Sequence, residues 1–160
     1  RLARKYQDIV LVVVGTGAVE RDLQAQARTL GVHERVRFTG FRSDVAQCLS
    51  AFDIFVLPSL AEYHSIALLE AMRAGKPIVA TDVGGNTESV RHDKDALVVK
   101  AADVDGLVSA LETLLSQDSL RKQLGQAARA RFLAEFTEDV MLEKTGAWLQ
   151  TCIRRHMQVG

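Results

Sequence analysis

The chain has 160 residues, of which 48% are hydrophobic and 25% are charged. This length and composition suit a single domain over residues 1–160 with one sizeable core, and they exclude a disordered or fibrous protein. Twenty basic and twenty acidic residues give a net charge of zero, so we expect no general attraction for nucleic acid. An anionic ligand must therefore be held by local groups.

The cysteines and the chain start give further expectations. Cys48 and Cys152 lie outside any CxxC or Cys/His cluster, which predicts two free core thiols and no metal site. No signal peptide is evident, and no run reaches the roughly 20 apolar residues that cross a bilayer, so we expect a cytoplasmic location. Residues 1–6 lack a methionine and are typical of a helix end, which indicates a piece of a longer protein.

Short apolar runs alternate with helical patterns along the chain. This alternation predicts an α/β fold with a doubly wound parallel sheet, because parallel strands need helical crossovers. Strands are predicted at residues 9–14, 35–40, 54–57, 77–80 and 96–99. Helices are predicted at residues 19–30, 43–49, 65–75, briefly after Gly85, and at 103–115, 119–134 and 137–153; residues 137–160 form a C-terminal helix and tail whose end, 158–160, frays.

Four loops follow predicted strands at their carboxyl ends. Doubly wound sheets bind ligands beyond that edge, so the ligand contacts are expected from these loops. They are residues 15–17, 40–42, 61–65 and 81–85.

The third of these loops carries two carboxylates around a polar turn. Pro58 ends the preceding strand because proline donates no hydrogen bond to the ladder, and Ser65 can cap the following helix. Glu62 then lies in the loop and Glu70 in the second helical turn. A ligand above the strand end could meet both.

Glu62 and Glu70 permit more than one interpretation. A catalytic pair of the glycosidase kind requires two carboxylates aligned across one bond, which a loop and a helix rarely provide. Recognition of the vicinal diols of ribose and sugar fits better, because carboxylates accept charge-assisted hydrogen bonds. Alternatively, Glu70 simply solvates a helix face.

The amides of Tyr63, His64 and Ser65 precede a helix. Backbone N–H groups at a helix start hold phosphate oxygens without a lysine, which suits a neutral protein. His64 is interpreted as a ligand contact, since a lone loop histidine is rarely a general base.

Two glycine motifs are candidates for ligand loops. Gly15-Thr16-Gly17 resembles the start of a dinucleotide fingerprint, but Glu20 replaces the third glycine and would oppose a pyrophosphate, so a tight turn is favoured over NAD binding. Gly84 and Gly85 allow close backbone approach to a ligand, and an ordinary turn is the alternative.

The remaining basic residues indicate no further site. Trp148 with Arg154 and Arg155 is too small a basic patch for a membrane surface, so we expect no membrane contact from this chain. Four arginines are predicted to lie on solvated helix faces: Arg91, Arg121, Arg129 and Arg131.

Taken together, these motifs resemble a known family. The chain is similar, over nearly its whole length, to the C-terminal domain of retaining, two-domain (GT-B fold) glycosyltransferases of family 4, the glycosyl transferases group 1 type. The segments that carry the resemblance are Val14-Gly15-Thr16-Gly17, residues 36–40, 53–59, Glu62-x7-Glu70, and residues 71–77 and 80–85.

The resemblance implies a Rossmann-like domain that binds a UDP- or GDP-sugar and needs no cofactor or metal. Transfer to an unknown acceptor hydroxyl would retain the anomeric configuration by a front-face mechanism, in which the departing diphosphate helps to deprotonate the acceptor. The acceptor domain lies N-terminal in relatives, so the chain alone should not turn over. Implied roles are Glu62 on sugar hydroxyls, Glu70 on the ribose diol, Tyr63, His64 and Ser65 on sugar and diphosphate, Phe41 and Arg42 beside the base, and Gly15, Gly84 and Gly85 around the pocket.

The chain departs from the family pattern at two places. Relatives have Glu-Gly-Phe where this chain has Glu62-Tyr63-His64, and tyrosine takes positive φ at a cost. Relatives also begin with a central strand that is absent here, and its loss would leave two strand edges unpaired. We therefore expect a homodimer or strand exchange. For the function, the alternatives to a glycosyltransferase are a non-catalytic scaffold or oligomerisation domain with a degenerate donor loop, and a related sugar-nucleotide epimerase or phosphorylase.

Overall fold

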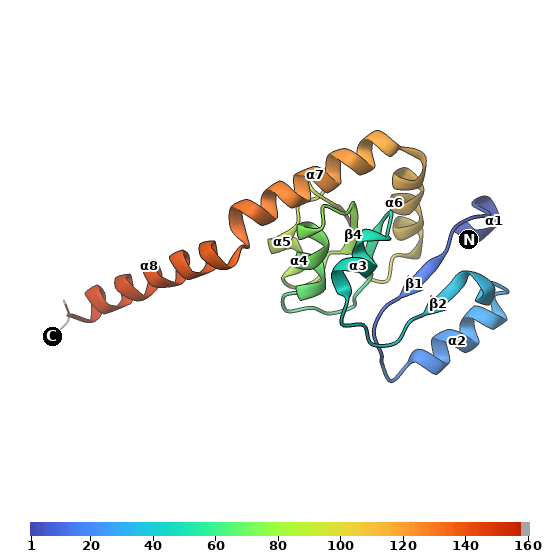
Figure 1. Ribbon diagram of the computed structural model, residues 1–160, viewed down its shortest axis with the longest axis horizontal. Coiled ribbons are helices and arrows are strands. Elements are labelled where there is room, and N and C mark those ends of the chain that lie inside the picture. Colours follow the sequence, from blue (N-terminus) through green and yellow to red (C-terminus); the bar gives the residue numbers. More distant parts are fainter. Residues whose placement is uncertain (158–160) are drawn as a thin grey trace. The chain divides into compact units, whose positions relative to one another are not determined.

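The computed structural model describes residues 1–157, with side chains to residue 154 (Figure 1). The predicted frayed end at residues 158–160 and the Arg155 side chain lie outside this part. The elements are α1 (Leu2–Lys5), β1 (Leu11–Val13), α2 (Glu20–Thr29), the 3₁₀ helix η1 (His33–Arg35), β2 (Val36–Phe38), α3 (Val45–Ser50), β3 (Phe55–Leu57), α4 (Ile66–Arg73), β4 (Ile78–Thr81), α5 (Asn86–Ser89), β5 (Leu97–Val99), α6 (Val104–Ser116), α7 (Asp118–Glu135) and α8 (Glu138–Met157).

The strands pair in parallel, which confirms the predicted α/β class. β1 pairs with β2, and β3, β4 and β5 form a second sheet in that order. Val79 of β4 lies opposite Val56 on one side and Leu97 on the other. The contacts divide the chain into two compact units, Arg1–Cys48 and Leu49–Gly160. The expected homodimer or strand exchange stays a prediction that light scattering tests.

The first unit brings two of the predicted loops together. Gly15 follows β1, Gly40 follows β2, and the Gly15 amide donates to the Gly40 carbonyl at 2.9 Å. Both residues have positive φ, 112° and 65°, which glycine adopts without strain. Arg35 of η1 donates to the Ala3 carbonyl at 2.7 Å and thereby holds α1.

The core of the second unit lies between the sheet and the helices that follow it. All of β4 is buried, because the strand is central in its sheet. The buried side chains of the core come from β4, β5, α6 and α7: Val79, Leu97, Ala110, Leu114 and Leu124.

Helices α4 and α7 pack at very short range (Figure 1). Gly75 ends α4 with φ 67°, and the amide of Lys76 reaches back to the Ala71 carbonyl at 3.0 Å. A methyl group added at Gly125 of α7 would lie 2.3 Å from the Gly75 carbonyl oxygen. The end of α4, and with it the loop that α4 carries, is therefore fixed by backbone contact with α7.

Several predictions about single side chains were wrong. Arg131 is not on a solvated face, since only 12% of its side chain is exposed. Arg91 is solvated as predicted, with 48% of its side chain exposed, but it lies beyond the end of α5 and donates through Nε, at 2.7 Å, to the fully buried carboxylate of Asp95. Cys48 is half-buried and Cys152 is exposed on α8, so the thiols are free as predicted but are not core thiols.

We predict that Gly125→Ala lowers the free energy of unfolding by about 1–3 kcal/mol, because the added methyl group overlaps the Gly75 carbonyl and overpacks the contact. Gly146→Ala is the matched control, since nothing lies within 4 Å of that position in α8. Urea unfolding of both variants tests this. An unfolding midpoint of Gly125→Ala equal to that of the wild type would contradict the close α4–α7 contact.

Candidate functional site

Two of the predicted loops of the second unit touch through their backbones. A Cβ atom at Gly84 would lie 1.7 Å from the Glu62 carbonyl oxygen, and one at Gly85 would lie 2.0 Å from that of Tyr63. No other residue type fits these two positions without moving the neighbouring loop. The close backbone approach predicted at Gly84 and Gly85 is therefore to the loop that carries Glu62 and Tyr63.

The Glu62 carboxylate is held by a short chain of hydrogen bonds. Its Oε1 accepts from the Ser59 hydroxyl at 2.8 Å. The Ser59 carbonyl accepts from the Thr81 hydroxyl at 2.7 Å, and Thr81 is only 4% exposed. Ser59 and Thr81 thus link the Glu62 carboxylate to the end of β4.

Ser65 caps α4 as predicted. Its side-chain oxygen accepts from the Leu68 amide at 3.3 Å, and the residue is 6% exposed. The loop amides therefore approach the positive end of the helix dipole. Glu70 lies half-buried in the second turn of α4, as predicted from the cap.

A hollow of about 540 Å³ lies where the two loops meet. Its size is in the range of small-molecule sites. It contains three of the predicted site residues, Glu62, Tyr63 and Gly84, together with Leu60, Ala61 and Val83. Glu70, His64, Ser65 and Gly85 are not in its lining.

Tyr63 does not strain the loop. In the described part of the chain, the non-glycine residues with positive φ are Asp93 and Ala102. Tyr63 therefore avoids the cost that tyrosine would meet in a positive-φ conformation. It is fully exposed at the loop tip. The non-catalytic scaffold stays an alternative prediction.

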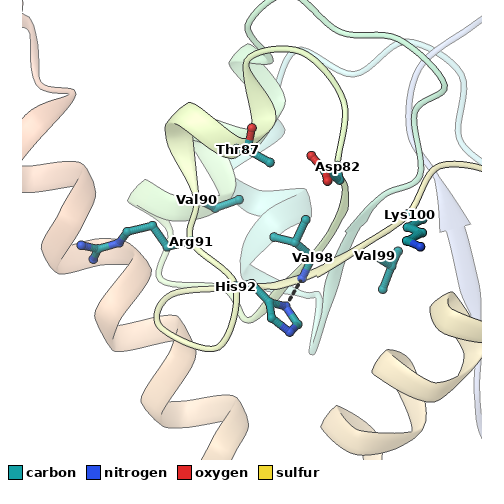
Figure 2. Close-up of a pocket in the computed structure, with 8 residues that line it drawn as sticks. All are labelled: Asp82, Thr87, Val90, Arg91, His92, Val98, Val99 and Lys100. Carbon is teal, nitrogen blue, oxygen red and sulfur yellow. Dashed lines mark hydrogen bonds between the residues drawn. The ribbon is translucent and has the colours of Figure 1, made fainter.

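A second hollow, of about 390 Å³, lies beyond the ends of β4 and β5 (Figure 2). Two of its polar groups have partners: the Val98 amide donates to His92 Nδ1 at 3.0 Å, and Arg91 points away from Asp82 and binds Asp95. It contains none of the predicted site residues. The hollow beside Glu62 is therefore the better candidate.

The predicted site residues of the first unit lie in its own loops. Phe41 is 80% exposed, and Arg42 donates through Nε to Asp44 at 2.7 Å. This hydrogen bond raises the pKa of Arg42 and lowers the pKa of Asp44. Because a lowered carboxyl pKa keeps the group charged at neutral pH, the pair is lost only when the pH falls through the lowered pKa of Asp44. Gly15 lies beside Gly40, as described above.

Sequence patterns missed the residues that support Glu62. Ser59 follows Pro58 and lies three residues before Glu62, which was a usable signal for a local hydrogen bond. Thr81 is 22 residues from Ser59, and its hydrogen bond follows only from the parallel pairing of β3 and β4.

Groups of three or more His, Cys, Asp or Glu side chains able to hold a metal ion do not occur among residues with described side chains. Within the described helices, none has both the length and the apolar character needed to cross a membrane.

Comparison with known proteins identifies the family. Residues 1–131 match the profile described as Glycosyl transferases group 1. The chain belongs to this family. The group 1 domain is 31% identical over 142 residues to the lipopolysaccharide core biosynthesis glycosyltransferase LpsE of Rhizobium meliloti, covering 89% of the chain and 41% of the relative. It is 35% identical over 105 residues to the Escherichia coli UDP-Gal:alpha-D-GlcNAc-diphosphoundecaprenol alpha-1,3-galactosyltransferase, covering 65% and 27%.

Solved structures support the same family. The crystal structure of Anabaena HepE in complex with UDP has a TM-score of 0.87 at 25% identity, covering 94% of the chain and 43% of HepE. The C-terminal domain of the group 1 family protein LpcC from Francisella tularensis shares the fold with a TM-score of 0.77 at 24% identity, covering 85% and 74%. The group 1 domain spans less than half of the length of LpsE, the E. coli enzyme and HepE.

We predict that Gly85→Ala in this group 1 domain speeds amide hydrogen exchange in the loop of residues 61–65, because the methyl group displaces the Tyr63 carbonyl. Gly17→Ala is the control, since nothing lies within 4 Å of that position. Exchange followed by mass spectrometry tests this. Equal exchange in both variants would contradict the contact between the two loops.

Proposed function

We propose that the chain is the donor-binding half of a glycosyltransferase that moves a sugar from a UDP-sugar to an acceptor hydroxyl with retention. The observation that carries this proposal is the Glu62 carboxylate, held by Ser59 at the edge of a hollow made by two backbone-packed loops. A fixed carboxylate beside a hollow of ligand size recognises hydroxyl groups.

Each acidic residue has its own role in this proposal. A carboxylate has about four lone-pair sites, and Ser59 uses one of those of Glu62, so Glu62 has acceptors left for sugar hydroxyls. Glu70, on the second turn of α4, accepts from the ribose diol. The amides between Tyr63 and Ser65 donate to the diphosphate at the start of α4, so that its charge needs no metal ion.

The nucleotide is proposed by similarity. HepE was crystallised with UDP and with UDP-glucose, and the E. coli relative is named for UDP-Gal. We therefore propose UDP rather than GDP as the nucleotide of the donor. Phe41 and Arg42 are proposed as contacts of the base. Gly84 and Gly85 keep their loop close to that of Glu62, and Gly15 keeps its loop close to Gly40.

The proposed chemistry follows a front-face path. The bond from the anomeric carbon to the diphosphate breaks, the acceptor oxygen attacks from the same face, and a diphosphate oxygen takes the acceptor proton. Glu62 orients the sugar through its hydroxyls and forms no covalent bond with it. The remainder of the enzyme supplies the acceptor, so this chain is expected to bind the donor without turnover.

Calorimetric titration with UDP, GDP and UDP-glucose tests this assignment. We predict tighter binding of UDP than of GDP. Glu70→Ala should lower the affinity for UDP and the affinity for UDP-glucose alike by about tenfold, the scale of one charged hydrogen bond. Glu62→Ala should lower the affinity for UDP-glucose by about tenfold and change the affinity for UDP by less than about twofold, because the proposed partner of Glu62 is the sugar.

Glu143→Ala is the control, because this carboxylate is exposed on α8, away from both loops in sequence. Absence of heat with either nucleotide, in a folded sample, would rule out donor binding. Equal weakening of UDP and UDP-glucose by Glu62→Ala would contradict the role given to the sugar contact.

A further inference from the structure

The junction of α7 and α8 touches the loop that follows Glu62. Phe136 follows the last residue of α7, and its ring centroid lies 6.3 Å from that of His64, with the ring planes at 48°. The guanidinium carbon of Arg131 lies 5.7 Å from the centre of the same Phe136 ring. One aromatic ring thus contacts the loop and a nearly buried cation.

Arg131 also closes the end of α5. Its Nε donates to the Ser89 carbonyl at 2.8 Å, and a terminal nitrogen donates to the Glu88 carbonyl at 2.9 Å. Its other terminal nitrogen lies 3.4 Å from the Glu135 carboxylate. The last carbonyls of a helix have no partner within the helix, and a helix of one turn is marginal alone. Arg131 supplies the missing donors from 42 residues away.

The short helix in turn holds the two glycines. The Ser89 hydroxyl donates to the Gly85 carbonyl at 3.2 Å, and Ser89 is completely buried. Gly85 lies against the Tyr63 carbonyl, which is next to His64. These contacts form a closed circuit. The loop touches Gly84 and Gly85, which directly precede α5. Arg131 binds the end of α5 and contacts Phe136, and the Phe136 ring contacts the loop at His64.

We propose that Arg131 and Phe136 are positioning residues for the donor loop of residues 62–65. The proposal rests on the proposed function, since the consequence is a change in donor affinity. Phe136 holds the loop at His64. Arg131 holds α5 and the preceding Gly84 and Gly85, which pack against the carbonyls of Glu62 and Tyr63. Neither side chain needs to touch the donor, because the loop that they hold carries the amides and the carboxylate.

Two conservative substitutions test the circuit in the full chain. Phe136→Leu keeps an apolar side chain but loses the ring contact with His64. Arg131→Lys keeps the charge but loses the planar fork that binds two carbonyls. Each should speed amide exchange in residues 61–65 by roughly threefold to tenfold without nucleotide, and weaken UDP-glucose by a similar factor, which is the scale of one aromatic pair.

An exposed arginine of α8 provides the control. Arg154→Lys should change neither the loop exchange nor the affinity beyond about twofold, the scale of surface substitutions. Phe136→Tyr keeps the ring and should restore wild-type values. In a His64→Ala background, Phe136→Leu should have no further effect on the loop, because residues that act through one contact are not additive.

The exchange readout needs no ligand, so it separates this proposal from the proposed function. If UDP-glucose does not bind even the wild type, the proposed donor binding is wrong, and so is the role of the two residues in positioning a donor loop. Faster exchange in the variants would then still show that Arg131 and Phe136 stabilise the loop. If the wild type binds, unchanged exchange or unchanged affinity in folded Phe136→Leu and Arg131→Lys would overturn the positioning role. An equal effect of Phe136→Leu with and without His64 would also overturn it.

Discussion

The candidate site depends on one contact of backbone against backbone. Gly84 and Gly85 lie so close to the carbonyls of Glu62 and Tyr63 that no side chain fits between the two loops. Interiors are densely packed, so such a contact transmits position with little tolerance. Ser59, Thr81 and the cap of α4 then fix what the loops carry. The geometry around Glu62 is set by the ends of β3 and β4, and not by the loop alone.

Much of the fold could be predicted from local patterns. Short apolar runs give strands, and Ser65 and Gly75 mark the start and end of α4, because capping and positive φ depend on residues close in sequence. Parallel pairing then brings loops to one edge of each sheet, which is why the loops at Gly15 and Gly40 touch, as do those at Glu62 and Gly84. Most boundaries shifted by one or two residues, as helix and strand ends do, but α8 ends four residues later than predicted.

The misses share a physical cause. The Arg131 side chain looks like a helix-surface arginine in sequence, but its partners are carbonyls 42 and 43 residues away. Every residue has a backbone carbonyl, so no sequence pattern predicts which one a distant arginine will bind. The close approach at Gly84 and Gly85 was predicted, but sequence shows that space is needed without showing that the loop of Glu62 fills it. Cys152 is exposed because residues 141–154 of α8 are exposed on all sides, with Gly146 alone half-buried among them.

The exposed tip at Tyr63 has a consequence for how this site can diversify. Its backbone φ is one that any residue adopts, and its side chain is fully exposed, while the carbonyl behind it is clamped by Gly85. Side-chain identity and loop conformation are thereby decoupled at this position. Substitutions of Tyr63 change the side chain exposed beside the site with little effect on the free energy of folding. Position 63 is therefore suited to divergence between relatives and to library design.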